Sequence, residues 1–152
     1  MDSLNRRDAF PIFLALGGLG DLGSSSEARA QDGSSMAKSR VIKFSELKAV
    51  PLANGGLMRR VMSGTLPTGE FVEVHESMLP AGKMPHPPHK HPNTEWLFIQ
   101  QGKLEYLDDG KPIAVGPGDI VFSASNIMHG LRNVGDTEAN YIVVSVSKQL
   151  PE

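Results

Sequence analysis

The stretch with the greatest chemical potential is "HPPHKHPNTEW", residues 86–96, which holds three of the five histidines of the chain and a glutamate. Side chains of an extended chain alternate between two faces, so His89, His91 and Glu95 can point the same way. The interleaved prolines favour extended backbone and reduce the freedom that a binding loop loses on ordering. Two imidazoles and a carboxylate at this spacing suit a divalent metal ion. A fourth ligand can come from a distant strand, and His129 is the only histidine further along the chain.

The composition narrows the kind of protein and the kind of site. The 152 residues suit one domain, and 39% hydrophobic residues are enough for a single core. The formal charge of −2 gives no electrostatic reason to expect nucleic acid or an anionic membrane as a partner. The chain has no cysteine, which excludes disulfides and thiolate ligands, so any metal must be held by nitrogen and oxygen. No apolar run reaches the ~20 residues of a membrane-spanning helix.

Residues 1–30 are predicted to be a signal peptide, which resembles the twin-arginine type. Arg6 and Arg7 form a charged start, residues 10–19 are mostly apolar, and Ala28 to Ala30 form a small-residue cleavage site. We therefore expect export to the periplasm or beyond, in a bacterial cell envelope. The alternatives are a disordered tail, or a true start at Met36, which would leave the protein in the cytoplasm. Residues 31–40 are expected to be a flexible linker and 41–152 the folded domain.

From Val41 onward, short β-like runs alternate with turns rich in glycine, proline and asparagine. Only "FSELKAVPL" allows one helical turn, before Pro51. This pattern predicts an all-β fold, a small antiparallel barrel or jelly roll. The expected strands cover residues 56–66, 70–79, 95–101, 103–107, 111–115, 119–123, 128–133 and 140–147.

Two motifs resemble those of the cupins, a family of small single-domain barrels. The first is a glycine, a spacer, His-x-His, three or four residues, a glutamate, six residues and a glycine. Here it reads Gly82, His89-Lys90-His91, Glu95 and Gly102, with six rather than five residues in the spacer.

The second motif has a glycine, five residues, Pro-x-Gly, two residues, a histidine, three residues and an asparagine. Here it reads Gly118, "DIVFS", 124–126 ("ASN"), His129 and Asn133, so that Asn126 replaces the second glycine. Because asparagine tolerates the left-handed conformation best among non-glycine residues, we expect this turn to form. The resemblance covers about residues 61–147. It implies four metal ligands, which are His89, His91, Glu95 and His129.

The resemblance also implies an antiparallel barrel, a double-stranded β-helix, with a metal ion inside one open mouth. Three imidazoles and one carboxylate leave two open positions on an octahedral ion, whereas tetrahedral zinc would be saturated. Manganese or iron is therefore favoured over nickel or zinc. Affinity trends alone would favour copper or zinc outside the cytoplasm, but twin-arginine export moves folded proteins that are already loaded.

Three functions stay open. One is a metal-dependent dioxygenase acting on a small oxygen-rich metabolite, with the ion as Lewis acid and template. Another is a module that binds a metabolite or sugar without catalysis. The third is an isomerase, which needs a base. His86 is the first candidate for that base, with Glu73, His75 and Tyr106 behind it.

Several further residues have a predicted place. Met84, Phe98 and Tyr106 are candidates for contacting the ligand. His75 shares one face of its predicted strand with the polar residues Glu73 and Ser77, which is more typical of a solvent-facing surface. Trp96 follows Glu95 and should face away from the site. Family resemblance also makes a homodimer a reasonable expectation.

Overall fold

The computed structural model describes residues 36–148. The predicted signal peptide, residues 31–35 of the predicted linker and residues 149–152 lie outside the described residues. The first element is a short 3-10 helix, η1 (Phe44–Glu46), and strands make up the rest. The strands are β1 (Ala49–Pro51), β2 (Leu57–Thr65), β3 (Glu70–Leu79), β4 (Thr94–Gln101), β5 (Leu104–Asp108), β6 (Lys111–Val115), β7 (Ile120–Ser123), β8 (His129–Asn133) and β9 (Ala139–Lys148).

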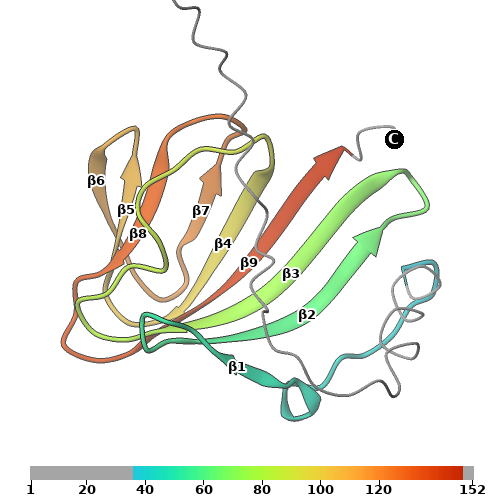
Figure 1. Cartoon of the computed structure of the whole chain (residues 1–152), viewed down its shortest axis with the longest axis horizontal. Coiled ribbons are helices and arrows are strands. Elements are labelled where there is room, and N and C mark those ends of the chain that lie inside the picture. The colour runs from blue at the N-terminus through green and yellow to red at the C-terminus, as the bar shows by residue number, and fades with distance from the viewer. Residues whose placement is uncertain (1–35, 149–152) are drawn as a thin grey trace, which may run out of the picture.

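The strands form two antiparallel sheets that face each other (Figure 1). One sheet has six strands in the order β1-β2-β3-β9-β4-β7, and the other has three in the order β6-β5-β8. Strand β9, which follows all the others in the chain, lies between β3 and β4 and pairs with both along most of its length. The predicted all-β class and the predicted barrel or jelly-roll architecture are therefore confirmed.

The core lies between the sheets and follows from the alternation of side chains along each strand. In β9, Tyr141 and Val143 are buried on the inner face, whereas Ile142 and Val144 are only partly buried. The buried cluster draws on both sheets and holds Leu79, Leu97, Ile99, Leu104, Tyr106, Val121, Leu131, Ala139, Tyr141 and Val143. Removing this apolar area from water is the main driving force for pairing the two sheets.

The predicted strands correspond to β2 through β9, and the single helical turn corresponds to η1. The sequence analysis missed β1, whose three residues end in Pro51 and carry too little pattern to be recognised. The turn in the second motif also forms as expected. Asn126 adopts a left-handed conformation with φ of 61° in the place where the family has glycine.

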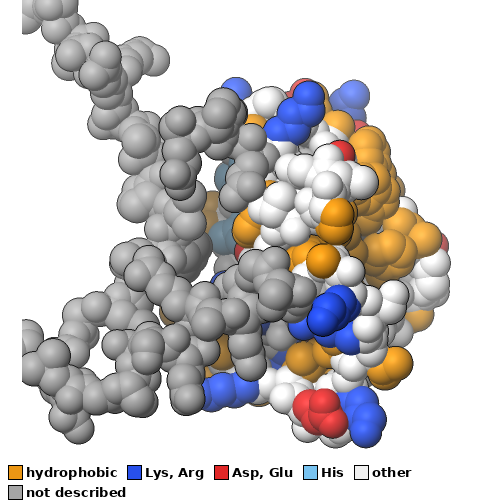
Figure 2. All heavy atoms as spheres, turned by 90° about the vertical axis from the view of Figure 1, so that its right-hand side faces the viewer, with side chains coloured by type: hydrophobic (Ala, Val, Ile, Leu, Met, Phe, Trp, Pro, Cys, Tyr) orange, Lys and Arg blue, Asp and Glu red, His pale blue; other side chains and the backbone are white. Residues whose placement is uncertain are grey.

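Some large hydrophobic side chains lie on the outer face of the six-stranded sheet. Phe98, Ile120 and Phe122 are 39%, 61% and 58% exposed. Trp96 lies on this face as predicted, because Glu95 and Leu97 beside it face inward, and its ring packs 5.4 Å from that of Phe122. Figure 2 shows hydrophobic side chains gathered along one side of the drawn face. Within residues 36–148, no helix has the length and apolar character needed to cross a bilayer.

Gly102, in the turn between β4 and β5, provides a test of how tightly the barrel is packed. Its φ of +97° is unfavourable for other residues, and an added Cβ would lie 2.5 Å from the Cβ of Ala139. We expect Gly102→Ala to lower the free energy of unfolding by at least about 3 kcal/mol, through backbone strain and overpacking together. Chemical denaturation measures this change.

Gly110→Ala is the matched control, because Gly110 has a φ of +81° but nothing lies within 4 Å of an added Cβ. Backbone strain alone should lower the free energy of unfolding by about 1–2 kcal/mol there. Equal losses in the two variants would contradict the close contact between Gly102 and Ala139.

Candidate metal centre

Backbone hydrogen bonds bring the two histidine-bearing segments together. His89 lies in the loop between β3 and β4, and His129 begins β8. The amide of His89 donates to the carbonyl of His129 at 2.9 Å, and the amide of His129 donates to the carbonyl of His89 at 2.8 Å. A third bond joins the same segments, from the amide of Asn126 to the carbonyl of His91 at 2.8 Å. Peptide groups, not side chains, therefore set where the histidines lie.

Asn133 anchors the start of the same loop. Its buried side chain donates to the carbonyls of Leu79, at 2.9 Å, and Thr137, at 2.8 Å. Its backbone amide donates to the carbonyl of Lys83 at 2.9 Å. Because Leu79 ends β3 and Lys83 lies in the loop, Asn133 fixes the point from which the histidine segment departs. The sequence analysis singled out this residue but gave it no partner.

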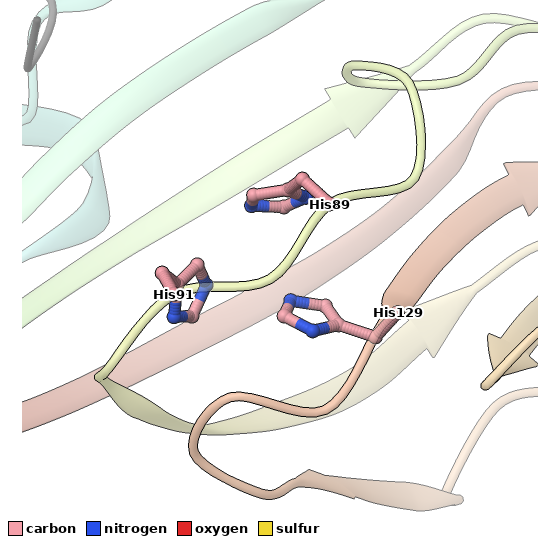
Figure 3. A group of neighbouring side chains, drawn as sticks. All are labelled: His89, His91 and His129. Carbon is pink, nitrogen blue, oxygen red and sulfur yellow. The ribbon is translucent and has the colours of Figure 1, made fainter. Parts of the chain in front are cut away.

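Three imidazole rings face a common space. One ring nitrogen from each of His89, His91 and His129 lies within 4.8 Å of the other two. Figure 3 shows the rings turned toward one another from the loop and from the start of β8. Glu95, on β4, adds a carboxylate, with Oε1 3.5 Å from His91 Nε2 and Oε2 3.7 Å from His129 Nε2. The structure thus brings together the four side chains that the motifs single out.

The hydrogen bonds of the rings leave nitrogen lone pairs directed at this space. His129 Nδ1 lies 2.9 Å from the carbonyl of Ile127, and His91 Nδ1 lies 3.2 Å from the carbonyl of Asn93. A carbonyl accepts only, so each Nδ1 carries the proton, and in both rings Nε2 is the nitrogen that faces the Glu95 carboxylate. His129 Nε2 and His89 Nδ1 are buried without a hydrogen-bond partner in the described part of the chain. Buried polar atoms of this kind fit a bound cation.

The pKa shifts of Glu95 and His89 fit a bound cation, whereas His91 must lose its proton to bind one. The side-chain contact with Glu95 raises the pKa of His91. Burial would raise the pKa of Glu95, but the neighbouring imidazoles of His91 and His129 outweigh it, so the pKa of Glu95 is lowered. Burial, with the neighbouring His86 ring, lowers the pKa of His89 to about 4. An ionised carboxylate and a neutral imidazole are the forms that bind metal ions.

A pocket of about 310 Å³ adjoins the cluster inside the barrel. His89, His129 and Glu95 form part of its wall, and Leu97, Leu131 and Val143 are among the apolar residues around the rest. Ligand sites are typically concave and mostly apolar, with a few polar groups that fix orientation. This cavity has that character and a size suited to a small molecule.

The other residues named from the sequence fall in different places. Tyr106 lines the pocket, and its hydroxyl forms a 2.8 Å hydrogen bond with the hydroxyl of Ser123. His86 also lines the pocket, with its ring centroid 4.1 Å from that of His89. Phe98 lies on the outer face of the sheet, and Met84 is not among the pocket residues. The structure therefore gathers His86 and Tyr106 around the cluster, but not Phe98 or Met84.

One pocket residue was assigned to solvent by the sequence analysis. His75, on β3, faces the interior of the barrel and lines the pocket. Glu73 and Ser77 lie two residues to either side of His75 on the same face of the strand. Because both are polar, the sequence predicted that this face contacts solvent. Ser77 also lines the pocket. The missing signal was the tertiary arrangement, in which His75 shares the pocket with residues of both sheets, such as Leu97 and Leu131.

A two-sheet barrel with a histidine cluster beside an internal pocket is the architecture of a cupin. Residues 75–145 match the family model described as "Cupin domain", Cupin_2, so the chain contains a Cupin_2 conserved-barrel domain. That segment carries all four side chains of the cluster.

Sequence comparison finds relatives over shorter segments. The dimethylsulfoniopropionate lyase DddQ of Ruegeria pomeroyi is 44% identical over 55 residues, which are 36% of this chain and 27% of that protein. The oxalate-binding protein of Thermotoga maritima is 30% identical over 59 residues, 38% of this chain and 49% of that protein. The matched segments thus span less than half of either relative.

Among solved structures, KdgF from Halomonas sp. superposes with a TM-score of 0.63 at 17% identity. The match covers 74% of this chain and 96% of that one. This likeness shows the shared fold.

Glu95 provides a direct test of the cluster. We expect Glu95→Gln to weaken Mn(II) binding, because the negative charge of the ligand is removed while its shape is kept. The loss should be at least about 10–100-fold, which is the usual effect of removing a residue that only hydrogen-bonds to a metal ligand. Isothermal titration of the metal-free chain measures the affinity.

Glu73→Gln is the matched control. Glu73 pairs with Ser145, which in turn pairs with Glu95, so the two carboxylates lie in one row two strands apart. Metal affinity should be almost unchanged in Glu73→Gln. An equal loss in both variants would indicate a general effect of negative charge and contradict ligation by Glu95.

Proposed function

We propose that this protein binds a divalent metal ion through His89, His91, His129 and Glu95, and that the ion and the adjoining pocket together bind a small carboxylate. The observation that carries this proposal is the position of the cluster in the wall of a pocket of about 310 Å³. A metal site on the outer surface would lack such a cavity.

The donor set supports an ion that keeps room for a ligand. Four protein ligands leave two positions on an octahedral ion, so manganese or iron is proposed in preference to zinc. When bound, such an ion supplies Lewis-acid polarisation of a ligand oxygen. The chain contributes the arrangement, because the carbonyls of Ile127 and Asn93 orient two of the imidazoles before any ion arrives.

The class of ligand is suggested by the named relatives. Oxalate and dimethylsulfoniopropionate are both small carboxylates. Each compound appears in the name of a relative that is similar to a segment of this chain. Much of the pocket wall is apolar, and no lysine or arginine is among the residues that line the pocket. The carboxylate of a ligand would therefore find no cationic side chain there. A metal ion would therefore be the group that attracts the carboxylate.

Oxygenase and isomerase activities are both compatible with open positions on the ion and stay predictions. Export to the cell envelope also stays a prediction, because residues 1–30 lie outside the described residues. A homodimer is likewise proposed only from the family resemblance.

Binding of oxalate and of its neutral amide analogue, oxamide, to the full chain tests the proposal. We expect the Mn(II)-loaded protein to bind oxalate at least about tenfold more tightly than oxamide, because only oxalate brings negative charge to the ion. We also expect the metal-free protein to bind neither. Isothermal titration with each probe, before and after loading, provides the measurement.

Two results would overturn the proposal. One is oxalate binding of equal strength without metal. The other is an intact metal site, shown by stoichiometric Mn(II) uptake, that binds neither probe.

A further inference from the structure

His75 lies on the same inner surface as Glu95 but further into the pocket. It pairs with Val143 of β9, and Val143 pairs with Leu97 of β4. The next row on the same face, two residues away along each strand, contains Glu73, Ser145 and Glu95. Since neighbouring strands lie about 4.8 Å apart, the backbone of His75 is about 10 Å from β4. A small molecule held at the cluster can therefore extend toward this ring.

The imidazole of His75 has no partner that explains its burial. Its Nδ1 is buried and has no hydrogen bond to any described residue. The nearest carboxylate oxygen, Oε1 of Glu73, is 3.8 Å from Nδ1, which is too far for a hydrogen bond. A histidine with a purely structural role is usually hydrogen-bonded when buried. Nδ1 therefore stays without a partner unless a molecule in the pocket, which His75 lines, supplies one.

The environment of His75 favours the neutral form of its ring. Burial lowers the pKa of His75, and this effect exceeds the opposing influence of Glu73 and Glu95. A neutral imidazole has one N–H donor and one acceptor nitrogen. It is therefore suited to a hydroxyl group, which can both donate and accept, rather than to a second carboxylate.

A pair of hydroxyl groups lies next to His75. Ser77 pairs with Tyr141 across β3 and β9, and the two side chains are hydrogen-bonded. Both residues line the pocket, and Tyr141 is 3% exposed. Met58, Leu97 and Val143 also line this part of the wall, so the polar groups are few. Few polar groups in an apolar wall are what sets ligand orientation.

We propose that His75, with the Ser77–Tyr141 hydroxyl pair, forms a second subsite that binds a hydroxyl group at the far end of the small carboxylate. This inference rests on the proposed function, because the carboxylate end is placed at the cluster. The preferred ligand is then a hydroxy acid whose two polar ends are separated by a short carbon chain. His75 determines specificity in this arrangement, whereas the cluster determines whether a carboxylate binds at all.

The test uses two probes with the same four-carbon chain, 4-hydroxybutyrate and butyrate, and the full Mn(II)-loaded protein. Wild type should bind 4-hydroxybutyrate about 3- to 10-fold more tightly, which corresponds to one or two added hydrogen bonds. In His75→Leu this preference should disappear while the affinity for butyrate is retained. In His75→Gln part of the preference should return, because the amide can replace a ring nitrogen as hydrogen-bond partner. Mn(II) affinity in each variant confirms that the cluster is intact.

A second measurement does not depend on a variant that folds. Addition of 4-hydroxybutyrate to wild type loaded with Cd(II), a diamagnetic ion that accepts six ligands, should shift the ¹⁵N resonances of the His75 ring, and butyrate should shift them much less. This compares the two probes in an unaltered pocket.

The outcomes separate the two proposals. If wild type binds both probes equally, or if His75→Leu keeps the preference, the second subsite is overturned and the metal-centred function stands. If the metal-loaded wild type binds neither probe nor oxalate, the proposed function is overturned, and the subsite is overturned with it.

Discussion

The pair of backbone hydrogen bonds between His89 and His129 is the constraint on which the rest of the site depends. It joins the loop before β4 to the first residue of β8, and so connects the two sheets at the end of the barrel where the cluster lies. Peptide groups make these contacts, so they form whether or not a cation is present. This differs from small zinc domains, in which metal binding supplies the folding free energy. Here the barrel holds the three histidines together without help from an ion.

The two ends of the barrel have different chemistry. At one end, His129 begins β8 beside Glu95 and the histidine loop. At the other end of β8, Asn133 is fully buried, and its partner across the sheet is Leu104, which is 1% exposed. Leu79 and Ala139 complete a closed, apolar end, with Asn133 satisfying the carbonyls that the strand ends leave there. Packing is therefore tightest away from the cluster, and this leaves room for a pocket beside it.

Most of the fold could be predicted from the sequence because it depends on local signals. Regular turns rich in glycine and proline separate the strands, and the residues of β9 alternate between buried and partly buried along most of its length. Asn126 was predictable for the same reason, since its left-handed conformation is a property of one residue. Parity could also have placed Phe98: it lies three residues after Glu95, on the opposite face of the same strand.

What the sequence could not supply was the pairing of distant strands. The interior position of His75 depends on the register of β3 against β9 and of β9 against β4, and nothing near His75 in the chain encodes it. The partners of Asn133 belong to three separate segments for the same reason. The four residues of the cluster were identifiable because their spacing follows a known motif, but their mutual distances required the assembled barrel.

The order of strands also bears on how the protein is made. Because β9 lies between β3 and β4, the six-stranded sheet stays divided until the ribosome has synthesised and released the segment that joins its two parts. Until then, the unpaired edges of β3 and β4 expose backbone N–H and C=O groups that can pair with other strands.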